Sequence, residues 1–156
     1  MENALSRIRS IADYQFGKGV GSKLFPDNVE ITYSKTTGRI RYVHSNGERL
    51  VTLRPTDGLF SLSITAARIL AENRGVAKCF VTVQQDVSTV IAEGHDVFAA
   101  HVTEADSVIH AKDEVVVVDE ESNVLAVGRA VLSSAEMQAF KTGVAVKVRR
   151  GCEKES

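Results

Sequence analysis

The stretch from Val115 to Arg150 constrains the fold more than any other part of the chain, because it carries signals for strand, turn, strand, helix and strand in succession. A run of four valines predicts the first strand, and the apolar segment 124–132 predicts a second, antiparallel strand. Residues 133–136, Ser-Ser-Ala-Glu, form a capping box that begins a helix. The last segment alternates strictly in hydrophobicity, which predicts a strand with Lys147 and Arg149 on its polar face.

The segment upstream of this stretch adds further short elements to the second half of the chain. Residues 78–84 and 97–102 are typical of strands, and residues 87–93 of a short helix that stops at a glycine. The second half then holds five or six short strands and two short helices. At this length, such a composition favours a small closed barrel.

The first half predicts an antiparallel sheet with helices. We expect an amphipathic helix over 3–14, three strands within 29–53 and a second helix over 61–73. Asn46-Gly47 is a strong hairpin signal between the second and third strands. The chain is therefore expected to form two domains, 1–75 and 76–156, with almost no linker between them.

A glycine-rich segment, 13–23, resembles nucleotide-binding loops only in composition. Counted from Gly17, a P-loop requires its second glycine where Ser22 stands. A dinucleotide-binding fingerprint requires a strand before the glycines, whereas a helix is expected here. The segment is either a flexible turn or a loop whose Lys18 and Lys23 approach a phosphate backbone.

The formal net charge of −1 hides an uneven distribution of charge. Residues 1–75 hold 11 Lys and Arg against 7 Asp and Glu, whereas residues 76–156 hold 8 against 13. A basic first half and a basic C-terminal strand allow two positive patches on a nearly neutral molecule. Arg39 and Arg41 are expected on one strand face, opposite Ile40 and Tyr42. That face is either solvated or directed at RNA.

Most of the motifs that carry chemistry are missing from the sequence. The four histidines lack metal-ligand spacing, no serine lies in a nucleophile elbow, and no cofactor or metal is expected. Aromatic residues are few, so an RNA-stacking sheet is not expected. No apolar run is long enough to span a membrane and no signal peptide is present, which favours a cytoplasmic protein. Cys79 and Cys152 are expected to be reduced, although a single bridge between them stays open.

Residues 76–150 resemble a PUA domain, the small RNA-binding pseudo-barrel named after pseudouridine synthases and archaeosine transglycosylases. The resemblance rests on short motifs that recur in the same order, namely Gly94 with 97–99, then 113–119, 125–130, 134–137 and 143–149. It implies an α+β fold in which an N-terminal antiparallel sheet with helices is followed by a PUA-type β-barrel with short helices.

The first half resembles the domain that precedes the PUA module in archaeal tRNA-guanine transglycosylase. The segments that carry this resemblance are 13–17, 34–41 and 52–60. Together the two resemblances cover nearly the whole chain and correspond to the C-terminal part of that enzyme. The family's catalytic barrel, with its aspartates and zinc cysteines, is longer than this entire chain. The resemblance therefore implies RNA docking without base exchange, and hence a protein that is not an enzyme.

In that family the PUA module grips the acceptor stem and 3′ end of tRNA with a short helix, the glycine loop after it and the last strand. Carried over to this chain, the implied surface consists of Gly94, His95, Val97, Phe98, Lys147, Arg149 and Arg150. A second patch is expected from Lys18, Lys23, Arg39 and Arg41 in the first domain.

The expected partner is therefore RNA, with tRNA or another structured RNA as the first choice. One alternative is an accessory subunit that delivers tRNA to a separate modifying enzyme, such as the barrel of a split transglycosylase. The other is a protein-interaction module that has lost RNA binding, which the acidic second half favours.

Overall fold

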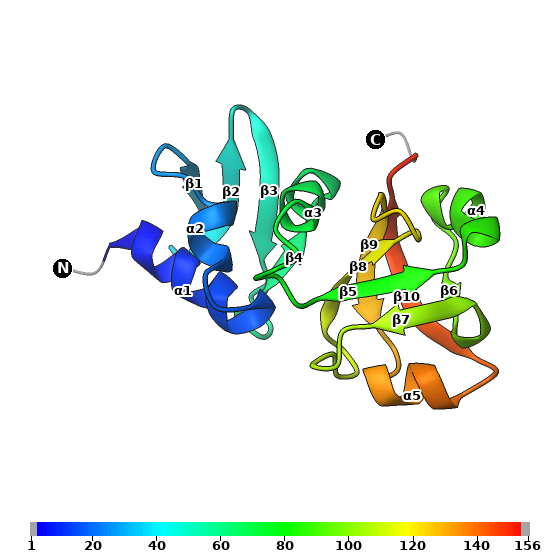
Figure 1. The fold of residues 1–156 in the computed structure, drawn as a ribbon. Coiled ribbons are helices and arrows are strands. Elements are labelled where there is room, and N and C mark those ends of the chain that lie inside the picture. Colours follow the sequence, from blue (N-terminus) through cyan, green and yellow to red (C-terminus); the bar gives the residue numbers. More distant parts are fainter. Residues whose placement is uncertain (1–2, 154–156) are drawn as a thin grey trace. The chain divides into compact units, whose positions relative to one another are not determined.

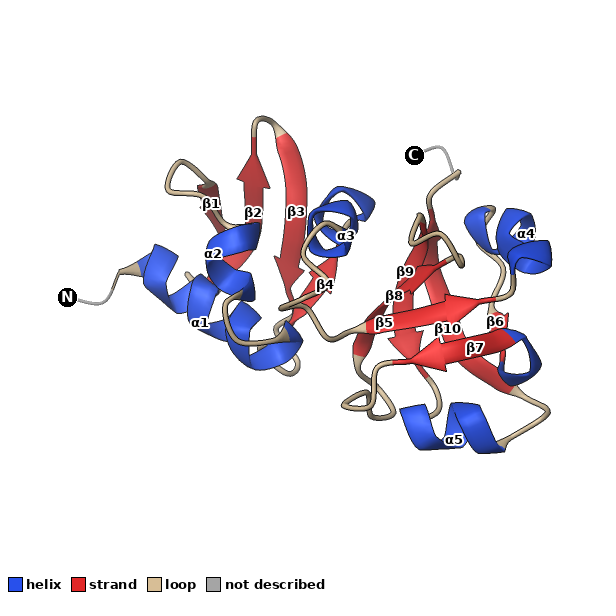
Figure 2. Ribbon diagram, viewed as in Figure 1, coloured by secondary structure: helices blue, strands red, loops and turns tan. Residues whose placement is uncertain are grey.

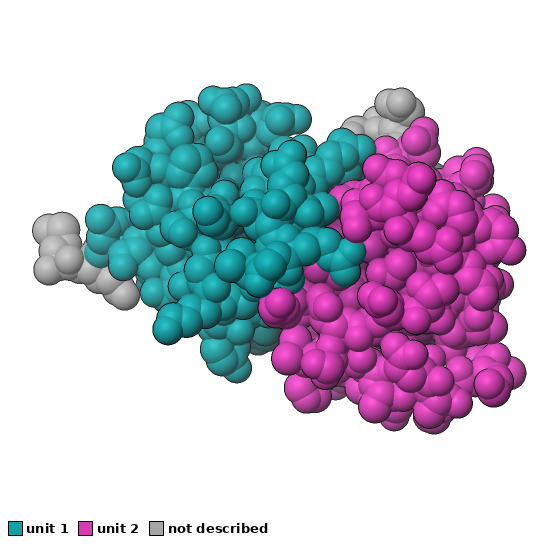
Figure 3. Space-filling model, in the orientation of Figure 1, with its two compact units in different colours: residues 1–77 teal, residues 78–156 magenta. Residues whose placement is uncertain are grey.

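The protein divides into two compact units at the bond between Ala77 and Lys78, as seen in a computed structural model that describes residues 3–153 (Figures 1 and 3). This division lies two residues beyond the domain boundary that the sequence predicts. Each unit has its own sheet and its own buried apolar core. Within the described residues, none of the helices combines the length and the apolar character needed to cross a membrane.

The first unit is a four-stranded antiparallel sheet, sheet A, with three helices packed on one face (Figure 2). The strands pair in chain order and are β1 (Glu30–Tyr33), β2 (Ile40–Ser45), β3 (Glu48–Leu53) and β4 (Phe60–Leu62). The helices are α1 (Ala4–Phe16), α2 (Val20–Leu24) and α3 (Ile64–Ala71). Val43, Val51 and Leu62 form a cross-strand row buried beneath these helices.

The fourth strand replaces the beginning of the predicted second helix. Phe60 pairs with Leu53, and its backbone N–H and C=O are bound by the side-chain amide of Gln15 from α1. The helix begins only after Ser63, whose hydroxyl accepts the N–H of Ala66. The expected helix over 61–73 is therefore too long at its N-terminus, because strand pairing and a serine cap together decide where it begins.

The glycine-rich segment is not a flexible turn, since it contains the short helix α2. The N–H of Gly21 donates to the carboxylate of Asp13 at 2.6 Å, so it is already engaged. A Cβ at Gly21 would overlap the backbone of Arg9 in α1. The guanidinium of Arg9 in turn donates to the carbonyl of Phe25. Close packing of two helices, rather than a phosphate, explains this glycine.

The second unit is a six-stranded, nearly closed barrel, sheet B. Its strands are ordered β6-β10-β9-β8-β5-β7, with β5 and β8 parallel and the other pairs antiparallel. The bounds are β5 (Phe80–Val83), β6 (Val97–Phe98), β7 (Val102–Ala105), β8 (Glu114–Val118), β9 (Val124–Ala130) and β10 (Val144–Gly151). The helices are η1 (Gln85–Val87), α4 (Ser88–Ala92), η2 (Ala99–His101) and α5 (Ser134–Ala139).

The capping box at the start of α5 is confirmed. The Ser133 hydroxyl accepts the N–H of Glu136 at 3.2 Å, and the Glu136 carboxylate accepts the N–H of Ser133 at 2.9 Å. Cys79 and Cys152 are not joined in a disulfide, so the bridge left open by the sequence is not formed.

The strict alternation expected along the last strand is wrong at two places. Ala145 and Val146 are both fully buried, because the pairing of β10 with β6 shifts register between Val144 and Val146. The pairing with β9 shifts again after Val148, which makes Arg149 an extra residue between the pairs Val148–Gly128 and Arg150–Val127. Such β-bulges redirect side chains that alternation would place elsewhere.

Candidate nucleic-acid interface

The exposed part of the last strand presents a cation beside a cation on the neighbouring strand. Lys147 lies directly opposite Arg129 of β9, and both side chains are exposed. Side chains directly opposite one another in an antiparallel pair are close neighbours on the same face. The sequence analysis missed Arg129, because only the register of β9 with β10 shows that it stands beside Lys147.

Arg149 has a different environment from Lys147. Its guanidinium binds both carboxylate oxygens of Glu114 on β8, with an Nη1–Oε1 distance of 2.9 Å. The Glu114 side chain is fully buried, whereas that of Arg149 is 42% exposed. A buried carboxylate requires such a partner, so Arg149 has a structural role besides any contact with RNA.

The loop after α4 is attached to β10. The Asp96 carboxylate accepts the N–H of Val148 at 2.9 Å, and the N–H of Glu153 donates to the carbonyl of Ala92. Gly151 packs so closely against the backbone of this loop that a Cβ would overlap the carbonyl of Ala92. These contacts hold Gly94 beside the end of the last strand.

Gly94 has the features of an open backbone position. Its φ is +110°, in the region that favours glycine, and nothing lies within 4 Å of the place where a Cβ would be. His95 next to it is exposed. An incoming ligand can therefore approach the backbone of this loop closely.

Two further residues of the predicted surface, Val97 and Phe98, differ in their exposure to solvent. Val97 is fully buried in the core of the second unit, so its side chain is unavailable to a ligand and its place in the predicted site is corrected. Phe98 is 47% exposed, and its ring contacts that of His101 edge-on at 6.4 Å between centroids. Arg150 is exposed on the last strand, where it pairs with Val127 of β9.

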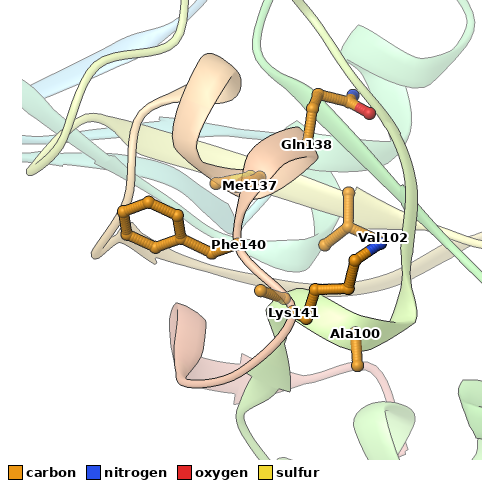
Figure 4. Close-up of a pocket in the computed structure, with 7 residues that line it drawn as sticks. Ala100, Val102, Met137, Gln138, Phe140 and Lys141 are labelled. Atoms are coloured by element: carbon orange, nitrogen blue, oxygen red, sulfur yellow. The ribbon is translucent and has the colours of Figure 1, made fainter.

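A hollow of about 210 Å³ lies between two segments of the second unit (Figure 4). One segment is η2 with the start of β7, and the other is α5 with the loop after it. Its lining consists of Ala99, Ala100, Val102, Met137, Gln138, Phe140 and Lys141. Lys141 is the one ionisable side chain in this lining, so the hollow holds no acid–base pair. It is a small recess with one cation at its border.

The predicted basic residues of the first unit lie in different elements. Lys18 and Lys23 are exposed at the two ends of the α2 segment. Arg39 is exposed in the turn before β2, outside the strand in which it was expected. Arg41 is in β2, and its Cζ lies 5.3 Å from the centroid of the Tyr42 ring. The expectation that Arg41 and Tyr42 occupy opposite faces is therefore wrong.

Sequence reasoning also missed the other neighbours of Tyr42. The Cζ of Arg49 lies 5.7 Å from the same ring centroid, and the His44 ring contacts it edge-on at 6.2 Å. Cation–π contacts occur within about 6 Å of a ring centroid. No signal in the alternation of the sequence predicts this cluster.

The described residues of the two units lack the clusters of ligands that hold metal ions in proteins. Within residues 3–153, no group of three or more His, Cys, Asp and Glu could hold a metal ion. The pKa of Asp119, which lies in the β8–β9 turn, is shifted. Burial raises its pKa, but hydrogen bonds from Asn123, Glu121 and Gln85 outweigh burial and hold the pKa below its ordinary value.

Two sequence families match the chain in succession. Residues 6–75 match the patch-forming domain C2 of tRNA-guanine transglycosylase, and residues 80–152 match the PUA domain. The tRNA-guanine(15) transglycosylase of Methanobrevibacter smithii is 41% identical over 150 residues, which cover 96% of this chain and 23% of that protein. Its counterpart from Pyrococcus furiosus is 43% identical, over 99% of this chain and 26% of that protein. The chain thus spans about a quarter of the length of these relatives.

Solved structures share the fold. A hypothetical protein from the archaeon Pyrococcus horikoshii has a TM-score of 0.75 at 26% identity, over 96% of this chain and 90% of that one. A conserved PUA domain protein from Thermoplasma acidophilum has a TM-score of 0.64 at 21% identity, over 98% and 93% of the two chains. The expected fold class, an antiparallel sheet with helices followed by a PUA-type barrel, is confirmed.

Proposed function

Since the chain consists of a domain C2 of the tRNA-guanine transglycosylase type followed by a PUA domain, we propose that it is a non-catalytic protein that binds tRNA or another structured RNA. The observation that carries this proposal is the exposed pair of Lys147 and Arg129 on the last two strands of the barrel. Cations on a rigid sheet contact phosphates without reading sequence, which suits recognition by shape.

The loop after α4 extends this surface. Gly94 and His95 contribute backbone that a sugar-phosphate can approach, and exposed Phe98 adds an aromatic face. Hydrogen bonds between the loop and β10 hold these groups in place before RNA arrives. Arg150 and Arg149 lie further along the same strand, Arg149 partly engaged by Glu114. A preformed surface loses less conformational entropy when it binds.

A second candidate function is an accessory subunit that presents tRNA to a separate modifying enzyme. It is favoured by the relatives, which are named as transglycosylases and are about four times as long as the stretch that matches this chain. In this arrangement the chain supplies affinity for the RNA and the partner supplies the chemistry.

The decisive experiment is a binding titration with total tRNA at several salt concentrations. Replacing Lys147 and Arg129 together by alanine is expected to weaken binding and to lower the slope of log K against log salt by about 0.7–0.9 per lost phosphate contact. Lys78→Ala, an exposed lysine at the start of the second unit, serves as the matched control. Equal affinity and slope for the double variant and the control would contradict the proposed surface.

A further inference from the structure

Two β-bulges in sheet A place both guanidinium groups beside the Tyr42 ring. In the first, Tyr33 of β1 lies opposite Ile40 and Thr32 lies opposite Tyr42, so Arg41 is an extra residue. Adjacent residues of a regular strand point to opposite faces. The bulge interrupts this alternation, so the Arg41 guanidinium contacts the ring of the adjacent residue, Tyr42.

The second bulge brings another guanidinium to the same ring. Val43 pairs with Val51 and His44 pairs with Arg49, so Leu50 is the extra residue of β3. Tyr42 pairs with Thr52, three residues after Arg49, and regular alternation would therefore direct Arg49 to the helix-covered face. The bulge instead buries Leu50 and brings Arg49 to the face of Tyr42.

The face around this cluster is polar, and no helix of residues 3–77 packs on it (Figure 2). Tyr42, Thr52 and Ser61 form a cross-strand row next to the row that is buried beneath the helices, and Thr32 continues it on β1. The neighbouring row consists of Glu30, His44 and Arg49. At the far end, the guanidinium of Arg54 donates to the Ser61 hydroxyl and to the carboxylate of Asp57.

The charges of this face are unequal. Arg41 and Arg49 flank the ring, whereas the carboxylate of these rows, Glu30, lies on the edge strand. The charge of Arg54 is matched by Asp57. Among the described residues of the first unit, the exposed large apolar side chains are those of Tyr14 in α1 and Tyr33 in β1. Tyr33 follows Thr32 in β1, so its side chain points away from the row that contains Thr32 and Tyr42. The face therefore offers one aromatic ring beside two cations rather than an apolar patch.

An aromatic ring beside two guanidinium groups on an open sheet face suits an unpaired nucleotide. A base stacks on the ring whatever its identity, and the guanidinium groups bind the phosphates on either side. The contribution of such stacking exceeds that of an exposed cation–π contact, so a base can displace a guanidinium from the ring. A protein partner would instead require apolar area, which this face lacks.

We propose that the open face of sheet A is a second RNA site that holds an unpaired stretch of the bound RNA, with a base on Tyr42 and phosphates on Arg41 and Arg49. This inference rests on the proposed RNA-binding function and adds to it a preference for single-stranded segments. The preference is for stacking and charge rather than for sequence.

The test uses the full-length chain and an oligouridylate of about ten nucleotides, a length within the usual site sizes of single-strand binders. Tyr42→Leu, which removes the ring, is expected to weaken binding at least tenfold while leaving the salt slope unchanged. Arg49→Gln is expected to lower that slope by about 0.7. Tyr42→Phe, which keeps the ring, should bind as the unaltered protein does, and Tyr33→Leu is the matched control on the same sheet.

A spectroscopic readout separates stacking from a structural effect. The chain has three tyrosines and no tryptophan, so a stacked base should quench its intrinsic fluorescence, and Tyr42→Phe should reduce that quenching while binding persists. A folded Tyr42→Leu variant with unchanged affinity, or a Tyr42-dependent interaction with a protein but not with RNA, would overturn the proposal. Retained tRNA binding in that variant would leave the proposed function intact, whereas an unaltered protein that binds no RNA would overturn both.

Discussion

The carboxylate of Glu114 and the guanidinium of Arg149 form a two-pronged ion pair across three strands of the barrel, from β8 to β10. The carboxylate has no solvent-exposed surface, and the strand between the two carries Arg129 directly opposite Glu114. The alternation in the sequence predicts Arg149 as a surface cation, whereas the structure pairs it with a carboxylate buried in the barrel. Two arginines and a lysine share this region, but they differ in role.

Removal of Arg149 is expected to destabilise the fold. Arg149→Ala leaves a buried carboxylate without its partner, and breaking a buried pair in this way costs about 3 kcal/mol. Urea denaturation monitored by circular dichroism measures the loss. Lys147→Ala, on the same strand but exposed, should change stability by less than about 0.5 kcal/mol.

A second variant keeps this prediction specific to the ion pair. Arg149→Met combined with Glu114→Gln removes both charges and should recover part of the lost stability. If Arg149→Ala were as stable as Lys147→Ala, the pair would have no structural importance.

Gly21→Ala is expected to destabilise the first unit. The new methyl group would overlap the backbone of Arg9, which a flexible side chain cannot relieve, so we expect a loss of about 2 kcal/mol. Gly75→Ala is the matched control, since it has open space around its Cβ position and no positive φ. A thermal melt that shifts equally for both variants would disprove close packing of α1 against α2.

Gly94→Ala separates backbone strain from RNA contact. At a φ of +110° the substitution should cost about 1 kcal/mol of stability and should also weaken tRNA binding, because the methyl group occupies the open space beside the loop. Gly58→Ala, at a φ of +72° in a turn of the first unit, should show the strain alone. Equal tRNA affinity for both variants would remove Gly94 from the binding surface.

The Asp119 turn should make stability depend on pH in the acid range. Because the folded pKa of Asp119 lies below the ordinary value of 3.8, the unfolded chain takes up the proton first as the pH falls. The stabilisation is therefore complete above about pH 5 and is lost progressively below about pH 4. Asp119→Asn should be less stable by about 2 kcal/mol at pH 7, and the difference should shrink in acid. A difference that is constant from pH 7 to pH 3 would contradict this assignment.

The two units are expected to bind RNA together. The segment 76–156 contains the complete barrel core and should fold alone, but it should bind tRNA at least tenfold more weakly than the whole chain, about 1.4 kcal/mol. Its salt slope should fall as well, because the basic residues of the first unit are gone. Equal affinity and slope for both proteins would show that the first unit takes no part in RNA binding.

Elements that depend on local signals were well predicted from the sequence. The Ser133–Glu136 capping box and the Asn46-Gly47 hairpin involve residues close together in the chain, so their geometry follows from neighbouring backbone and side chains. The order of the elements and the PUA-type barrel followed from those signals and from the resemblance. The α2 helix escaped prediction because its glycine, Gly21, serves packing rather than flexibility.

The local caps and turns and most of the strands and helices were predicted from the sequence alone, because each depends on interactions over a few residues, whereas α2 and β4 were not. Only the tertiary structure decided that Val97 is buried, that Arg149 neutralises Glu114, and that Arg41 and Arg49 meet at Tyr42. The physical reason is register: one extra residue in a strand reverses the faces of all that follow, and the partner strand decides where that residue is placed.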